Sequence, residues 1–427
     1  MSYETPLALG HSDRLTALEL NSDGSKLLTA AIDHRVAVYN VNRLTSERKQ
    51  LDVWTAHDAE LRDVKWFHPS TGTNFVTLGN DLQMRVWTED VYQAPMSGRR
   101  FRRVATIKSE QLIPFAGVDV KTIGENTYIA VIDRQGLLSI YEPARADEFH
   151  EWSLIDQFYV HYPIPERADH TSFRVQFDPN LFSLPYQCSL SDDAEQVSLA
   201  VTVMGGIKLY RSTSDADAIN SLVNAQQASG LFSKSTNRMK LFEVFHSTNL
   251  AAGSDGVEFL LRDVAWCADN YLGRDVLATA SIDGSVRIFS VEARGKSSTN
   301  EAGKSAADPK QHSRLNANGQ QSNLTSALHQ SNISSSPAES QMRTSHPFSY
   351  THLTRPLCIL RNAHMDAWSV RWKGNGEALL SSGSDGTVKI WKRCPARPEQ
   401  FELFAEQAGE DYDSESESSD EVPIKER

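Results

Sequence analysis

The sequence lacks the features that mark membrane proteins, secreted proteins and zinc proteins. No run of 18 apolar residues occurs in the 427-residue chain, and its first residues are not a basic stretch followed by an apolar one. Cys188, Cys267, Cys358 and Cys394 are scattered without a CxxC pair. This scatter argues against a zinc site or a disulfide framework and for a reducing compartment. We therefore expect a cytosolic or nuclear protein that does not insert into a membrane.

Positive charge is also scarce. The chain has 43 Lys and Arg residues against 55 Asp and Glu residues, so its formal net charge is −12. This is the wrong sign for a domain whose main task is to neutralise phosphates, and we expect no direct nucleic-acid binding. One basic cluster, at residues 99–103, could contact an acidic partner, although we interpret it as a solvated strand or loop.

Catalytic motifs are missing as well. Gly303-Lys304-Ser305 ends like a phosphate-binding loop, but Ser298 stands where the first glycine of such a loop is required. Neither a GxSxG nucleophile elbow nor an HExxH helix occurs in the sequence. We therefore expect no enzymatic activity, no cofactor and no metal.

What the chain does contain is a repeat. Six stretches that end in an aromatic residue read as short β-strands. In the last one, EALLSSGSDG (377–386) and TVKIWK (387–392) are joined by residues typical of a tight turn. Such a pair predicts a β-hairpin. In four repeats the turn aspartate precedes the aromatic residue by six positions: Asp33 and Tyr39, Asp81 and Trp87, Asp283 and Phe289, and Asp385 and Trp391.

Two middle repeats are degraded. In TYIAVIDRQGLLSIYE (127–142), Gln135 stands where the turn aspartate is expected, and in VSLAVTVMGGIKLYR (197–211) Met204 does. Their strand pattern persists, so we count six repeats. A period of this kind indicates the blades of a β-propeller. We predict an all-β fold with six blades, which would use about 240 to 270 residues as one domain.

The repeats resemble the WD40 family, whose blades begin with Gly-His or a similar pair. Gly10-His11, Ala56-His57 and Ala363-His364 match that start, whereas Val257 stands at this point of the fifth repeat. The resemblance implies a hydrogen-bonded network of the histidine, the turn aspartate, a strand Ser or Thr and the Trp, with a structural role. The residues that it implies are His11, His57, His364, Asp33, Asp81, Asp283, Asp385, Trp87 and Trp391.

The domain organisation follows from the spacing of the repeats. We predict a propeller over residues 1–394, with disordered loop insertions at about 212–238 and 295–346 where the sequence is polar and of low complexity. Residues 395–427 are expected to form a C-terminal extension. It includes a possible outer strand, QFELFAE (400–406), and a disordered acidic tail with seven acids in residues 410–421.

A closer resemblance covers most of residues 8–393. It rests on residues 57–89, on EWSL (151–154), on residues 261–292, which include LRDVAW and the inserted NYLGR, and on the sixth repeat. These stretches resemble the SEH-type WD40 nucleoporins, a sister group of the COPII coat propeller. The resemblance implies a scaffold subunit of the Y-shaped outer-ring complex at the nuclear envelope, which supports nucleocytoplasmic transport of protein and mRNA. It also implies a place in a SEA/GATOR-type complex at the vacuole or lysosome surface that regulates TOR signalling.

The six repeats leave no evident closing strand, so we predict an open propeller with edges that need a cover. The resemblance implies that an α-helical-stack nucleoporin inserts a β-blade in trans between the first and last blades. A COPII coat subunit, a closed WD40 substrate receptor and a propeller enzyme remain alternatives, and ordinary core packing is an alternative role for the edge residues. The expected partner-binding edges are Leu15, Ala17, Val36 and Val38 in the first blade, and Val370, Trp372, Val388 and Ile390 in the sixth.

Overall fold

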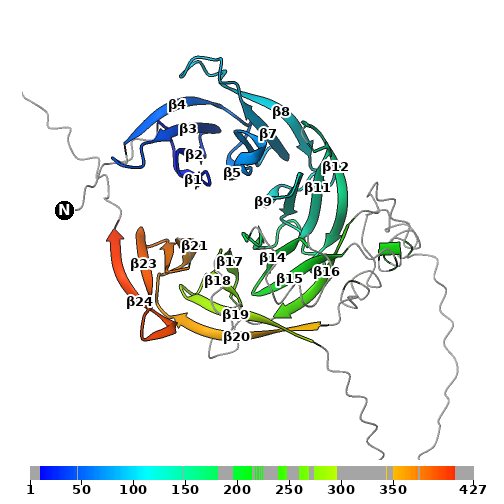
Figure 1. Cartoon of the computed structure of the whole chain (residues 1–427), viewed down its shortest axis with the longest axis vertical. Coiled ribbons are helices and arrows are strands. Elements are labelled where there is room, and N and C mark those ends of the chain that lie inside the picture. Colours follow the sequence, from blue (N-terminus) through cyan, green and yellow to red (C-terminus); the bar gives the residue numbers. More distant parts are fainter. Residues whose placement is uncertain are drawn as a thin grey trace, which may run out of the picture.

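In the computed structural model of the chain, β-strands are the main elements of the described residues. The structure describes residues 10–45, 47–146, 148–180, 196–213, 239–247, 259–268, 274–295, 350–373 and 376–408, and single positions at 217, 219, 220, 222, 224 and 343. Six four-stranded antiparallel sheets are arranged around a central axis (Figure 1). The prediction of a six-bladed β-propeller is confirmed.

Each of the first three blades takes four consecutive strands, from the inner strand beside the axis to the outer strand at the rim. Blade 2 also contains a short 3-10 helix, η1, at Pro69–Thr71. The strands are β1 (Leu15–Leu20), β2 (Lys26–Ala31), β3 (Arg35–Val41) and β4 (Arg48–Thr55) in blade 1; β5 (Leu61–Trp66), β6 (Asn74–Gly79), β7 (Gln83–Glu89) and β8 (Phe101–Lys108) in blade 2; and β9 (Phe115–Ile123), β10 (Asn126–Asp133), β11 (Leu137–Arg145) and β12 (Glu148–Tyr159) in blade 3.

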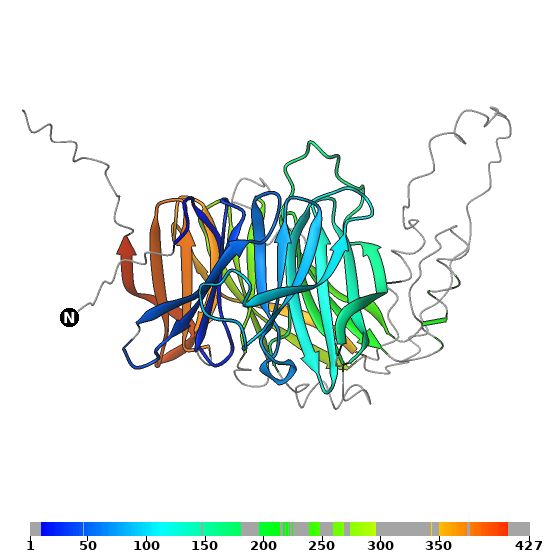
Figure 2. The same ribbon diagram turned by 90° about the horizontal axis from the view of Figure 1, so that it is seen from above.

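The last three blades follow the same order. In Figure 2 the blades stand side by side, with the red strand β24 at one edge of the disc. The strands are β13 (Phe173–Phe177), β14 (Ser198–Val203), β15 (Gly206–Thr213) and β16 (Lys240–Ser247) in blade 4; β17 (Leu261–Trp266), β18 (Asp275–Ser281), β19 (Val286–Gly295) and β20 (Tyr350–Leu360) in blade 5; and β21 (Ala367–Lys373), β22 (Ala378–Gly383), β23 (Thr387–Cys394) and β24 (Arg397–Ala408) in blade 6.

The hairpin between the second and third strands shows how the sequence sets the fold locally. In blade 6, β22 and β23 pair from Ala378 opposite Lys392 to Ser382 opposite Val388. Asp385 accepts a hydrogen bond from the backbone N–H of Thr387 at 3.2 Å. Gly386 has a φ of 68°, a left-handed conformation that glycine adopts without strain.

Hydrophobic clusters hold neighbouring blades together. One cluster lies between each pair of neighbours from blades 1 and 2 to blades 5 and 6. Between blades 1 and 2, Trp54 stacks on Phe101 with ring centroids 5.1 Å apart, and Phe75 stacks on Trp87 at 6.4 Å. Burying one such side chain stabilises the fold by about 1.5 to 3 kcal/mol. Among the described residues, no comparable cluster joins blade 6 to blade 1.

The structure extends the sixth blade beyond the expected domain boundary and places single residues of both expected insertions in the propeller. β24 pairs with β23 along its length, so the sixth blade ends at Ala408 rather than at 394. Within the segment 212–238, the side chain of Leu222 is buried in the cluster between blades 4 and 5. Within 295–346, Arg343 is buried against blades 3 and 4. The other residues of 296–346, and residues 409–427, lie outside the described part of the chain.

Candidate functional site: the open side of the ring

Blades 2 and 6 contain the complete polar network that the sequence suggested. In blade 2, His57 Nδ1 lies 2.9 Å from Asp81 Oδ1, and His57 Nε2 lies 2.7 Å from Thr77 Oγ1. The indole N–H of Trp87 donates to the same Thr77 oxygen at 3.0 Å. In blade 6 the corresponding distances are 3.0, 2.7 and 2.9 Å, within the set His364, Asp385, Ser381 and Trp391.

The contacts in blade 2 shift the pKa values of Asp81 and His57. Partial burial alone would raise the pKa of Asp81, but the hydrogen bond from His57 holds this pKa below its usual value. Burial lowers the pKa of His57. A neutral imidazole beside an ionised carboxylate ties a turn to a strand. We propose that the role of these residues is structural.

Blade 1 contains the network with Tyr39 in place of the Trp, and blade 5 contains part of it. In blade 1, His11 lies 3.2 Å from Asp33 and 2.9 Å from Thr29, and Tyr39 replaces the Trp. In blade 5, Asp283 accepts from the backbone N–H of Ser285 at 3.0 Å and pairs with Arg287 at 2.7 Å. Val257 lies outside the described residues.

Blade 3 has a turn carboxylate at another position than expected. Asp133 accepts hydrogen bonds from the backbone N–H groups of Gln135 at 2.8 Å and Leu137 at 2.9 Å. The Gln135 side chain donates to the carbonyl oxygen of Pro165 at 2.8 Å, so it links two segments rather than replacing the aspartate. In blade 4, Met204 occupies the turn with a φ of 56°.

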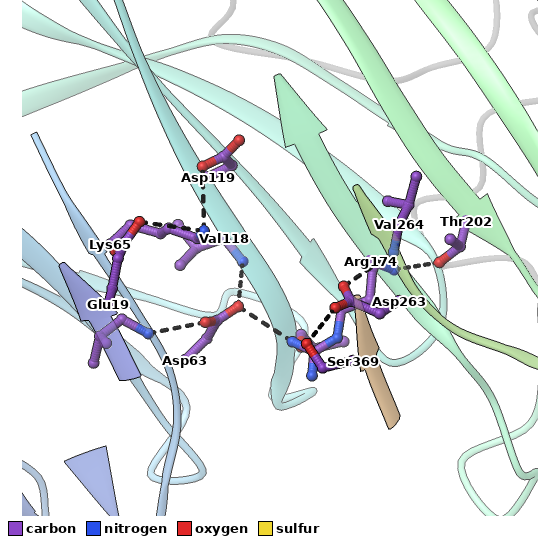
Figure 3. Close-up of polar contacts among 12 residues, drawn as sticks. Glu19, Asp63, Lys65, Val118, Asp119, Arg174, Thr202, Asp263, Val264 and Ser369 are labelled. Atoms are coloured by element: carbon purple, nitrogen blue, oxygen red, sulfur yellow. Dashed lines mark hydrogen bonds and ion pairs between the residues drawn. The ribbon is translucent and has the colours of Figure 1, made fainter. Parts of the chain in front are cut away.

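The inner strands share a second pattern, which the sequence reasoning missed. At each of the five junctions between neighbouring blades, a side-chain oxygen of one inner strand accepts a hydrogen bond from a backbone N–H of the next inner strand. We call these side chains the junction acceptors (Figure 3 shows several of them). They are Glu19 to Trp66 N at 2.9 Å, Asp63 to Val118 N at 3.5 Å, Asp119 to Phe177 N at 2.7 Å, Gln176 to Trp266 N at 2.7 Å, and Asp263 to Val370 N at 3.2 Å.

Ion pairs between inner strands also link blades 1, 2 and 3. Lys65 lies between Glu19 and Asp119, at 3.4 and 3.8 Å. Burial raises the pKa of Glu19 to about 7, although Lys65 opposes this change, and burial also raises the pKa of Asp119. Burial alone would lower the pKa of Lys65, but the two carboxylates raise it above its usual value.

The sixth junction, from blade 6 to blade 1, has different chemistry. The junction acceptors are the third residue (Asp63 and Asp263), the fourth (Gln176) or the fifth (Glu19 and Asp119) of their inner strands, and the third to fifth residues of β21 are Ser369, Val370 and Arg371. Ser369 donates its hydroxyl to Asp263 at 2.8 Å, and Arg371 pairs with Asp263 at 2.6 Å. A guanidinium has no acceptor atom. Among the described residues, the inner strand of blade 6 thus has no carboxylate or amide at these positions, and its Ser369 hydroxyl is bonded to blade 5.

Apolar side chains are exposed on both sides of this open junction. In β1, Ala17 packs toward blade 2, so the alternating Leu18 and Leu20 face the other way and are 50% and 51% exposed. In β23, Trp391 packs toward blade 5, and Val388, on the opposite face, is 41% exposed. The gap is visible between β1 and β21 (Figure 1).

This geometry corrects the list of expected edge residues. Ala17, Val36 and Val38 belong to the cluster between blades 1 and 2 and are not available to a partner. Val370 and Trp372 pack against blade 5, where the Trp372 indole donates to the Ala265 carbonyl at 3.0 Å. Leu15, Val388 and Ile390 do lie on the faces that border the open junction. The alternation of side chains along a strand shows which residues share a face, but it does not show which face borders the open junction.

No metal or membrane feature is found in the described ranges. Within them, no group of three or more His, Cys, Asp or Glu side chains is placed to hold a metal ion. No helix in the same ranges is long and apolar enough to cross a membrane.

Comparisons with known proteins show what the chain is similar to. The WD domain, G-beta repeat family matches residues 4–40 and 355–392. Nucleoporin SEH1 of Chaetomium thermophilum is 27% identical over 392 residues, covering 72% of this chain and 68% of the relative. Nucleoporin SEH1 of Saccharomyces cerevisiae is 21% identical over 397 residues, covering 91% and 95%. A shorter match, 28% identical over 78 residues, covers 18% of this chain and 26% of the protein transport protein SEC13-2 of Candida glabrata. The sequence matches and the six-bladed fold therefore support an SEH-type WD40 nucleoporin.

Proposed function

We propose that this chain is a scaffold subunit of the outer ring of the nuclear pore complex, without enzymatic activity. Its place there would be the Y-shaped complex at the nuclear envelope, where it supports nucleocytoplasmic transport of protein and mRNA. The names of the relatives support the nucleoporin role.

The observation that carries the proposal is the open junction between blades 6 and 1. The exposed leucines of β1 face it from one side and Val388 from the other. Exposed apolar faces of this kind are normally covered by a partner. The partner that fits is an α-helical-stack nucleoporin that contributes a β-blade in trans, by β-strand addition.

Co-expression tests this partner directly. The full-length chain is produced with a helical-stack nucleoporin, with or without the β-blade of that partner, and the products are weighed by light scattering after size exclusion. We expect a 1:1 complex only when the β-blade is present. The double variant Leu18→Glu/Val388→Glu should abolish the complex because it places charges on both faces of the junction.

A control uses two leucines that are more exposed than Leu18 and Val388. Leu44 and Leu112 are 95% and 65% exposed and lie outside the junction, so Leu44→Glu/Leu112→Glu should leave the complex intact. Equal binding by both double variants, or binding that does not need the β-blade, contradicts the proposal.

Two further placements belong to the same proposal. The chain would be shared with a SEA/GATOR-type complex at the vacuole or lysosome surface, which regulates TOR signalling. The match to SEC13-2 favours a COPII coat propeller as a second candidate, although it covers only 18% of the chain. Affinity purification with mass spectrometry separates the three: outer-ring, SEA/GATOR-type or coat subunits would be recovered.

A further inference from the structure

The five junction acceptors show what holds one inner strand to the next in this propeller. Each bond runs in the same direction, from a backbone N–H of the later blade to a side-chain oxygen of the earlier one. The acceptors are four carboxylates and one amide. No blade precedes blade 1 among the described residues, and no side chain of those residues accepts such a bond from β1.

The backbone of β1 is arranged to receive such a bond. Asn21 N donates to the carbonyl oxygen of Lys26 at 3.0 Å, which makes 21 and 26 a hydrogen-bonded pair. Because hydrogen-bonded and non-hydrogen-bonded pairs alternate in an antiparallel ladder, Leu18 opposite Thr29 and Leu20 opposite Leu27 are non-hydrogen-bonded pairs. The N–H groups of Leu18 and Leu20 therefore point away from β2.

These two positions correspond to the donors at the other junctions. Alignment of β1 with β5 and β21 through their shared bulge places Leu20 at the position of Trp66 and Leu18 at that of Val370. Trp66 and Val370 both donate to junction acceptors. A blade beside β1 would thus complete the pattern if its inner strand carried an acceptor.

On the other side of the gap, the polarity is reversed. Arg371 occupies the fifth position of β21, the position at which Glu19 and Asp119 are the acceptors of their own strands. Its side chain is 52% exposed, and one of its nitrogens is bonded to Asp263. The guanidinium has five N–H donors in all, so it can also donate to a strand that lies beside β21.

We infer that the blade which closes this ring has an acidic or amide side chain in the middle of its inner strand, which accepts from the N–H of Leu18 or Leu20 while Arg371 donates to the same strand. This inference rests on the proposed function, because it specifies the chemistry of the blade that the partner inserts. It also gives a basis for selectivity. An inner strand with only apolar side chains leaves these donors unpaired. A strand with basic side chains also places like charges beside Arg371.

Hydrogen exchange at single-residue resolution tests the inference on the full-length chain with its helical-stack partner. We expect the amides of Leu18 and Leu20 to exchange at least tenfold more slowly in the complex than in the chain alone. The amide of Trp66 is already bonded to Glu19, and its exchange should change little. A complex that forms without slowing either leucine amide overturns the inference and leaves the proposed function standing, whereas absence of any complex overturns both.

A charge-reversal experiment tests the inferred bond from Arg371 to the inserted strand. Arg371→Glu should weaken the complex at least tenfold, and replacement of the inner-strand acid of the partner by Arg should restore it. Lys373→Glu is the matched control, because Lys373 is exposed on the same strand outside the acceptor positions. The Arg371→Gln variant separates loss of folding from loss of binding, since it keeps donors toward Asp263. Binding that is unaffected by Arg371→Glu, or a junction closed by residues 1–9 of this chain or by a second copy of it in cross-linking, overturns the inference.

Discussion

Arg343 and Asp156 form a two-point ion pair although 187 positions separate them in the chain. The two terminal nitrogens of Arg343 lie 2.9 and 3.0 Å from the two carboxylate oxygens of Asp156. The guanidinium also lies over the ring of Phe158, 3.7 Å from its centroid, and Lys240 approaches the same carboxylate at 3.3 Å. Burial alone would raise the pKa of Asp156, but the two cations lower it to about 2. A residue of the expected loop insertion is thus part of the propeller.

Loss of this arginine should destabilise the fold. Arg343→Ala leaves Asp156 buried with Lys240 alone and removes the stacking on Phe158, so we expect the free energy of unfolding to fall by about 3 kcal/mol. Arg355→Ala is the control, because Arg355 and Glu399 form an exposed ion pair, which contributes about 0 to 1 kcal/mol. Chemical denaturation of both variants checks the difference, and equal midpoints would contradict it.

Two deletions that differ by a few residues separate the insertion from its anchor. Shortening a surface connection changes closure entropy only logarithmically, so removal of residues 296–338 should leave thermal stability nearly unchanged. Removal of 296–345 also removes Arg343 and should lower the melting temperature as the point variant does. If both deletions melt alike, the arginine is not the anchor.

The sequence was sufficient for the blades but not for this contact. Each hairpin is specified within about 15 residues by alternating apolar positions and a turn such as Ser384 to Gly386. Nothing near Arg343 in a polar stretch indicates that it reaches a carboxylate 187 positions away. The prediction that Ala17 is available to a partner was wrong for a related reason. A bulge between Leu15 and Ala17 shifts the alternation of side chains, so Ala17 packs against blade 2.

The turn of blade 3 gives a prediction for Asp133, a residue that the repeat pattern did not single out. Asp133 satisfies two backbone N–H groups, so Asp133→Ala should cost about 1 to 3 kcal/mol of stability. Asp81→Ala should cost a similar amount, because it breaks the bond to His57. Gln135→Ala loses one bond, to the Pro165 carbonyl, and we expect about 1 kcal/mol rather than a negligible effect. Denaturation midpoints in which Asp133→Ala matches wild type would refute this assignment.

The sequence does contain a pattern that corresponds to the junction acceptors, but this pattern has several explanations. LTALEL, LRDVKW, FRVQF and LRDVAW each contain an acid or amide in mid-strand. Such residues also suit the solvated face of any half-buried strand. Only the register of neighbouring inner strands shows that Glu19 and Asp263 accept bonds from the next blade. The open junction is recognised by the same register, because the equivalent positions in β21 hold Ser369 and Arg371.

The acceptor at the first junction should make stability depend on pH. The pKa of Glu19 rises from 4.5 to about 7 on folding, mainly because its carboxyl is buried. The unfolded chain then loses this proton at a lower pH than the folded chain does. The contribution of Glu19 to the free energy of unfolding is therefore greatest below pH 4.5 and is lost as the pH rises through about 7.

Glu19→Gln removes this titration while it keeps an oxygen that can accept from Trp66. We expect the melting temperature of the variant, relative to wild type, to increase between pH 4.5 and pH 7.5 and to level off above that range. The variant also takes one carboxylate away from Lys65. Because lysine stays charged over this pH range, that loss does not change the sign of the dependence of the melting temperature on pH. Glu125→Gln, at an exposed turn position, is the control and should follow wild type at every pH. A difference for Glu19→Gln that stays constant, or that decreases with rising pH, would show that this carboxyl does not titrate in the way its burial between two blades requires.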